Sequence, residues 1–161
     1  MKRFDAVKLV HEHLRDDHLV VICNGMIGRE VWTAGDRPNH FYMIGSMGLG
    51  SSIGMGLAQT KEESDVVVID GDGNVLMNMG TLGNIGAAKL ENLYHIVLDN
   101  SVHDSTGGQK TIADTFALEE VAKVCGYKRV ELAKTWDELK RKLEHFFDEP
   151  GPAMLRVVVE P

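Results

Sequence analysis

Residues 66–74 read VVVIDGDGN, an apolar run that passes directly into a glycine-rich turn. Four successive β-branched residues are typical of a strand buried on both faces of a parallel sheet. A second apolar run, His95 to Leu98, ends in a similar way at Asp99-Asn100. Because ligands of open α/β sheets bind beyond the carboxyl ends of the strands, we expect Asp72 and Asn100 to meet at one binding site.

Strand and helix patterns alternate on both sides of this segment. Further strands are predicted over residues 19–23, 94–98, 128–132 and 154–159, with a short extended piece over 41–44. Helices are predicted over residues 3–16, 45–60, 77–90, 118–124 and 135–147, whereas 28–39 and 101–115 read as irregular. This alternation favours one α/β domain over residues 1–161, with a mostly parallel sheet and helices on both of its faces.

Local patterns add detail to three of these helices. The helix over residues 77–90 is expected to bury four side chains, those of Met77, Leu82, Ile85 and Ala88. Thr115 is a candidate N-cap for the helix that follows it. Thr135 is a candidate N-cap for the last helix, and Glu138 three residues later completes a capping box.

Composition limits the classes of function. The formal net charge of −7 argues against nucleic-acid binding as the main task, because such proteins need a basic surface. Cys23 and Cys125 stand far apart in apolar surroundings, which favours buried free thiols in a reducing cytoplasm. The charged N-terminus is unlike a signal peptide, and no apolar run is long enough to cross a membrane. We therefore expect a cytoplasmic protein.

The oxygen-bearing side chains at the two strand ends suit a hard cation. A carboxylate, an amide and nearby glycine N–H groups can together hold a divalent metal ion and a phosphate. Taken singly, Asp72 could equally cap a helix and Asn100 could make a turn. The Rossmann fingerprint fails here, since position 76 is Leu where the third glycine would stand.

The spacing of GDG and Asp99-Asn100 resembles the motif of thiamine diphosphate-dependent enzymes, with residues 74 to 98 between its two parts. That motif ends in two asparagines, so Asp99 is a departure from it, whereas the second position is kept as Asn100. The resemblance implies that thiamine diphosphate is bound through Mg²⁺. The ligands from the protein would be the side chains of Asp72 and Asn100 and the backbone carbonyl of Val102.

The same resemblance assigns further residues to the cofactor. Gly71, Gly73 and Asn74 would approach the diphosphate and donate N–H groups to it. Asn24-Gly25, after the first strand, would contact a second phosphate, although a plain turn explains that pair equally well. The carbonyl of Gly45 would accept a hydrogen bond from the aminopyrimidine, and Met47 would hold the cofactor in a bent shape. Met47 could instead be an ordinary core residue.

Residues 100–109 read NSVHDSTGGQ, which is the most distinctive stretch of the chain. It is similar to the corresponding segment of phosphonopyruvate decarboxylases and of the β subunits of sulfopyruvate decarboxylases. His103 can move a proton near neutral pH, and Ser105, Thr106 and the glycine amides can donate to oxyanions. The resemblance therefore implies His103, Ser105 and Thr106 as catalytic residues acting on a small anionic 2-oxo acid. A simple polar loop is the alternative.

The resemblance covers only the diphosphate-binding domain of these enzymes. Their reaction also needs a pyrimidine-binding domain with an activating glutamate, and 161 residues leave no room for it. The expectation is therefore a β subunit that needs an α subunit in a hetero-oligomer, converting sulfopyruvate to sulfoacetaldehyde and CO₂. Phosphonopyruvate is the alternative substrate. A split oxoacid oxidoreductase, or a non-catalytic phosphate- or nucleotide-binding module, is the alternative function.

Overall fold

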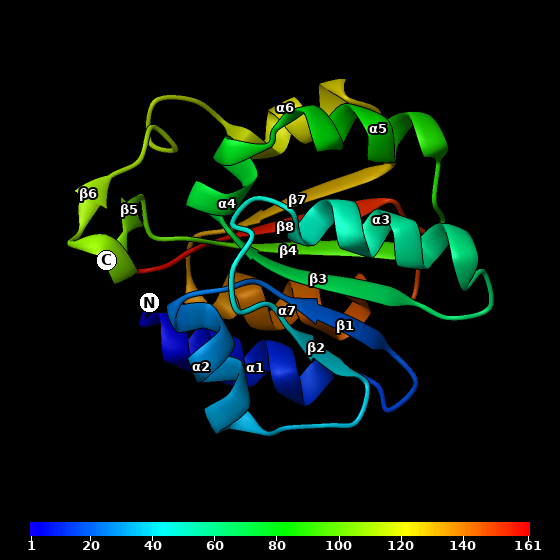
Figure 1. Ribbon diagram of the computed structural model, residues 1–161, viewed down its shortest axis with the longest axis horizontal. Coiled ribbons are helices and arrows are strands. Elements are labelled where there is room, and N and C mark those ends of the chain that lie inside the picture. The colour runs from blue at the N-terminus through cyan, green and yellow to red at the C-terminus, as the bar shows by residue number, and fades with distance from the viewer.

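The computed structural model describes residues 1–161 and contains a six-stranded sheet (Figure 1). The strand order is β2-β1-β3-β4-β8-β7, and every neighbouring pair is parallel. The strands are β1 Leu19–Ile22, β2 His40–Tyr42, β3 Val66–Gly71, β4 Leu93–Asp99, β7 Arg129–Ala133 and β8 Ala153–Val158. A separate antiparallel pair consists of β5 Val102–His103 and β6 Gln109–Lys110, with the short 3-10 helix η1 Asp104–Thr106 between them. The predicted parallel sheet is confirmed.

Helices cover both faces of the sheet, as the alternation predicted. On one face lie α1 Arg3–His13, α2 Met26–Ala34 and α7 Trp136–Phe146, and on the other lie α3 Gly50–Thr60, α4 Asp72–Met77, α5 Gly80–Ala88 and α6 Leu118–Val124 (Figure 1). Each layer has its own apolar core. Every residue of β3 and β4 is buried, which explains their continuous apolar sequence. None of the helices is long and apolar enough to cross a membrane.

The direction in which the chain leaves β1 and β3 creates a crevice between them. After β1 the chain enters α2 on one face of the sheet, where Ile27 and Val31 are buried in that face's core. After β3 it enters α4 on the opposite face, where Val75 is buried. Neighbouring strands whose connections diverge in this way form a topological switch point, where ligands of open α/β sheets bind.

The structure corrects several local predictions. Residues 28–39 are largely helical, because Ile27 and Val31 bury one face of α2 despite the glycines around them. The helix predicted over 77–90 begins only at Gly80, because Met77 is the last residue of α4, and Met77 (62% exposed) and Ala88 are both exposed rather than buried. Thr115 is not the N-cap of α6, since Ala117 holds that position.

Other details are confirmed. The predicted capping box joins Thr135 and Glu138 at the start of α7. Both cysteines are free thiols, although only Cys23 is fully buried.

Candidate functional site

A pocket opens at the switch point, beyond the carboxyl ends of β1, β3 and β4. Its walls come from the turn after β1, the GDG segment, the end of β4 and the η1 segment. It is lined by Arg3, Asn24, Gly25, Met26, Ile27, Met47, Gly71, Asp72, Gly73, Asn74, Leu98, Asn100, Val102, His103, Asp104, Ser105 and Thr106. The fold therefore brings together segments that stand far apart in the sequence, and it places Asp72 and Asn100 in one pocket, as the strand-end argument predicted.

Asp72 is the buried charge of this pocket, with only 2% of its surface exposed. Its carboxylate accepts a hydrogen bond from the Thr111 hydroxyl at 2.5 Å, and the backbone N–H groups of Gly73 and Asn100 also donate to it. Burial raises the pKa of Asp72, and these hydrogen bonds only partly offset that effect. Since none of its partners is a lysine or arginine, Asp72 is a buried carboxylate without a cation.

Asn100 lies beside Asp72 in a tightly shaped turn. Its side-chain oxygen accepts from the backbone N–H of Val102 at 3.2 Å. The next residue, Ser101, has a φ of +56°, a conformation that non-glycine residues seldom adopt. Asp99 stabilises this conformation, because one of its oxygens accepts from both the backbone N–H and the hydroxyl of Ser101. The turn therefore fixes where the Asn100 amide points.

Gly73 lines the pocket at a point where neighbouring side chains come close to its backbone. A Cβ atom at this position would lie 2.7 Å from the His103 ring and 3.2 Å from the Met47 methyl group. Met47 is thus a pocket residue rather than a core residue. The side chain of Asn74 turns away to accept a hydrogen bond from the Gly48 backbone N–H at 3.1 Å, which ties the loop around Met47 to α4.

The turn after β1 faces the η1 segment across the pocket. A Cβ atom on Gly25 would lie 3.7 Å from the Ser105 hydroxyl oxygen, so the two segments nearly touch. The side-chain oxygen of Asn24 is buried without a hydrogen-bond partner. An orphaned buried polar atom is costly unless a ligand or water satisfies it. The assignment of Asn24 to a ligand stays a prediction, and this oxygen would need a hydrogen-bond donor or a cation as its partner.

Most of the predicted site residues line this pocket, but Gly45 does not. It lies in an exposed loop with no other atom within 4 Å of an added Cβ, so nothing in this chain occupies its surroundings. Its assignment to the aminopyrimidine stays a prediction.

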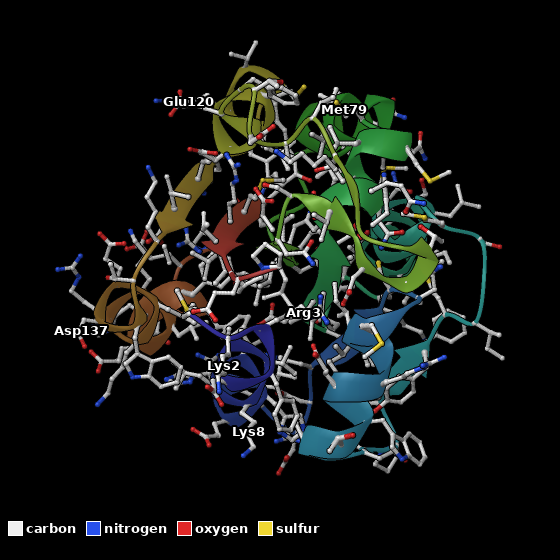
Figure 2. All side chains as sticks on the ribbon, turned by 90° about the vertical axis from the view of Figure 1, so that its left-hand side faces the viewer. Lys2, Arg3, Lys8, Met79, Glu120 and Asp137 are labelled. Carbon is white, nitrogen blue, oxygen red and sulfur yellow. The ribbon has the colours of Figure 1, made fainter.

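The sequence reasoning missed Arg3. Its guanidinium donates to both carboxylate oxygens of Glu30, at 2.9 and 3.1 Å, and to Asp104 at 3.0 Å. Figure 2 shows Arg3 near the middle of the end face, with Lys8 and Asp137 on one helical layer and Met79 and Glu120 on the other. No local signal marks Arg3, because its partner Asp104 stands 101 residues away in the sequence.

The pocket fits a phosphate held by a divalent cation. No cluster of three His, Cys, Asp or Glu side chains is present that could hold a metal ion alone. A cation beside Asp72 would thus need the Asn100 amide, a backbone carbonyl and oxygens from the ligand, which is the usual arrangement for Mg²⁺. The lone buried carboxylate of Asp72 and the absence of a side chain at Gly73 agree with such a ligand.

Comparisons with known proteins agree with this geometry. Residues 23–157 match the family model of the thiamine pyrophosphate enzyme C-terminal TPP binding domain. The chain is 41% identical to the sulfopyruvate decarboxylase subunit beta of Methanothermobacter thermautotrophicus, covering 100% of this chain and 83% of that subunit. It is 40% identical to the corresponding subunit of Methanocaldococcus jannaschii, covering 92% of this chain and 78% of that one.

Two other comparisons involve longer proteins. The chain is 41% identical to a phosphonopyruvate decarboxylase of Streptomyces viridochromogenes, covering 99% of this chain but only 40% of that protein. A solved structure described as a thiamin diphosphate-dependent enzyme of Mycobacterium smegmatis superimposes with a TM-score of 0.81 at 19% identity. It covers 100% of this chain and 32% of the other, and this likeness shows the shared fold.

Proposed function

Because the chain belongs to the thiamine pyrophosphate enzyme family, as a C-terminal TPP binding domain, we propose that it is one subunit of a split 2-oxo acid decarboxylase. The substrate is sulfopyruvate, which loses CO₂ to give sulfoacetaldehyde. The observation that supports this most directly is the meeting of Asp72, Asn100 and the His103–Thr106 segment around one pocket. The similarity to sulfopyruvate decarboxylase β subunits over nearly the whole chain supports the choice of substrate.

Thiamine diphosphate, when bound, supplies the electron sink for loss of CO₂ from a 2-oxo acid. In this proposal Asp72, Asn100 and the Val102 carbonyl hold Mg²⁺, and Mg²⁺ holds the diphosphate. Gly71, Gly73 and Asn74 let the diphosphate approach the backbone, and Asn24 and Gly25 contact it from the turn after β1. The buried carboxylate of Asp72 gains the cation that its surroundings lack, and that pairing favours its ionised form.

The η1 segment provides the groups that face the substrate. The Ser105 hydroxyl lies at the pocket mouth beside Gly25 and makes no hydrogen bond within the chain, so it is free to donate to an oxyanion. Thr106 differs, since its hydroxyl lies within 3.0 Å of the Gln109 side-chain oxygen and 3.3 Å of the His103 carbonyl. The imidazole of His103, against Gly73, is placed to hold or deliver a proton near the reacting atoms.

We propose that the missing half of the site comes from an α subunit that carries the pyrimidine-binding domain. A second groove runs beside the pocket and shares Asn24, Gly25 and Ser105 with it. Apolar side chains along this groove are exposed, notably Trp32 at 59% and Ile44 at 100%. Large apolar side chains exposed next to an incomplete site are typical of a surface that another chain covers.

Replacing Ile44 with aspartate should therefore weaken assembly with the partner at least about 10-fold, because it buries an unpaired charge in the interface. Val124→Asp is the matched control, since Val124 is 88% exposed on α6, which covers the opposite face of the sheet from α2. The affinity for a co-purified partner can be measured by calorimetry. Equal affinities for the two variants would exclude this surface as the interface.

The choice of substrate is tested on the assembled complex. Aldehyde release should be measured with sulfopyruvate and with phosphonopyruvate, each in the presence of Mg²⁺ and thiamine diphosphate. We expect a higher kcat/KM for sulfopyruvate. Preference for phosphonopyruvate would select the alternative that the Streptomyces relative favours, and release from neither would rule out both substrates.

A further inference from the structure

A single arginine at the carboxyl end of the sheet joins three segments around the candidate metal site. Arg156 on β8 has only 10% of its side chain exposed. Its Nε donates to Asp99 at 2.8 Å, one terminal nitrogen donates to Glu119 at 2.5 Å, and the other donates to the Ala113 carbonyl at 2.9 Å. These acceptors belong to the end of β4, to α6 and to the loop between β6 and α6.

One of these contacts leads to Asp72. Ala113 is held through its carbonyl by Arg156, and its N–H donates to the Thr111 hydroxyl oxygen at 3.3 Å. That same hydroxyl donates to the Asp72 carboxylate at 2.5 Å. The backbone N–H of Thr111 also donates to the Ser101 carbonyl at 2.9 Å, which fastens the loop to the turn around Asn100. Arg156 thereby fixes the loop that orients Asp72.

A second contact leads to Asn100. One oxygen of Asp99 accepts from Arg156, and the other holds Ser101 in its left-handed conformation. Asn100 lies between Asp99 and Ser101 in the chain, so these contacts help to fix the turn that carries its side chain. The same guanidinium thus acts on both expected metal ligands, through one or two intermediate residues in each case.

Arg156 also pairs with the buried carboxylate of Asp99, which stands where the thiamine diphosphate motif has an asparagine. Asp99 is 1% exposed, stands next to Asn100 and acts on Asp72 as a like charge. A buried carboxylate without a partner would be costly and would compete for the cation. The guanidinium keeps Asp99 paired, while Glu119 lies nearer to the surface with 11% of its side chain exposed.

We propose that Arg156 is a positioning residue, which holds both metal-binding side chains in place and neutralises Asp99 so that Asp72 remains the carboxylate for the cation. This inference rests on the proposed function, because it concerns the Mg²⁺ and diphosphate site. The inference predicts that the effect of removing Arg156 depends on the negative charge of Asp99.

The test compares four variants in the assembled complex: Arg156→Met, Arg156→Lys, Asp99→Asn/Arg156→Met and Arg129→Met. Arg129 is the matched control, because it also bridges carbonyl groups and a glutamate but lies on β7 away from the pocket. Calorimetry gives the Mg²⁺ affinity at saturating thiamine diphosphate, and thermal unfolding without ligand gives the stability. Hydrogen exchange at the Val102 and Thr111 amides reports the geometry of the site without any ligand.

We expect Arg156→Met to weaken Mg²⁺ binding about 10- to 100-fold, the usual effect of removing a residue that orients metal ligands. Arg156→Lys keeps the positive charge but loses the planar guanidinium, which bonds several acceptors at once. Its Mg²⁺ affinity should therefore fall between those of Arg156→Met and the wild type. The double variant should recover part of the loss, because the unpaired carboxylate next to Asn100 is gone and only Glu119, which is farther along the chain from the metal ligands, loses its partner. Exchange at both amides should be faster in Arg156→Met and unchanged in Arg129→Met.

Unchanged Mg²⁺ affinity and unchanged amide exchange in Arg156→Met would overturn the inference. An equal loss of Mg²⁺ affinity in Arg129→Met, at the same thermal stability, would overturn it too. A double variant no better than Arg156→Met would overturn the role of the Asp99 charge. Failure of the proposed function gives a different result, since the wild-type complex would then show no Mg²⁺-dependent binding of thiamine diphosphate at all.

Discussion

Replacing Asp72 with alanine should weaken Mg²⁺-dependent binding of thiamine diphosphate by more than about 100-fold in the assembled complex. Changes to residues that merely orient a metal ligand cost about 10- to 100-fold, so loss of the only carboxylate ligand should cost more. The reason lies in the pocket itself, where Asp72 is a buried carboxylate whose partners are a hydroxyl and two N–H groups. Titration calorimetry with and without Mg²⁺ measures the effect.

Stability distinguishes this role from a structural one. Removing the carboxylate loses the hydrogen bonds from Thr111, Gly73 and Asn100, each worth about 1 kcal/mol, but it also removes a buried charge without a cation, and the two effects largely offset each other. The free energy of unfolding without ligand should therefore change by no more than about 1 kcal/mol. The control is Asp114→Ala, which removes an exposed carboxylate from the neighbouring loop. Full affinity in Asp72→Ala would refute the metal assignment.

Replacing Gly86 with alanine should destabilise the fold by about 3 kcal/mol or more, at the upper end of overpacking penalties. An added Cβ would lie 1.9 Å from the Cys125 carbonyl oxygen and 2.9 Å from the Gly126 Cα atom. Both are backbone atoms, which cannot move aside as a flexible side chain can. The close contact sets the position of α6, which carries Glu119, the partner of Arg156.

Gly83 on the same helix is the matched control. Nothing lies within 4 Å of a Cβ added there, so Gly83→Ala should stabilise α5 by about 0.5–1 kcal/mol through the better helix propensity of alanine. Urea unfolding of both variants gives the comparison. Similar stabilities would mean that α5 and α6 do not pack as closely as described.

Local sequence was sufficient for the sheet and for much of the pocket. The runs that form β3 and β4 are fully buried, so their apolar character identifies them without any distant information. The rule that strand ends of parallel sheets gather at one edge then brought Asp72 and Asn100 together. In the structure these two residues and the His103–Thr106 segment line one pocket.

The features that sequence reasoning missed depend on contacts between distant residues. Arg3 meets Asp104 across 101 positions, and Arg156 meets Asp99 across 57. No periodicity or motif encodes such a pairing. Met77 was wrongly expected to be buried because it ends α4 and does not belong to α5, and a continuous apolar pattern does not show that break.

In the proposed enzyme this chain carries only part of the active site. The most direct measurement is aldehyde release from sulfopyruvate as a co-purified partner is titrated into a fixed amount of the chain, with Mg²⁺ and thiamine diphosphate present. We predict no release by the chain alone, and a rate that rises with the partner and saturates at a fixed ratio. Turnover by the chain alone, or none at any ratio, would contradict this division of the active site between two chains.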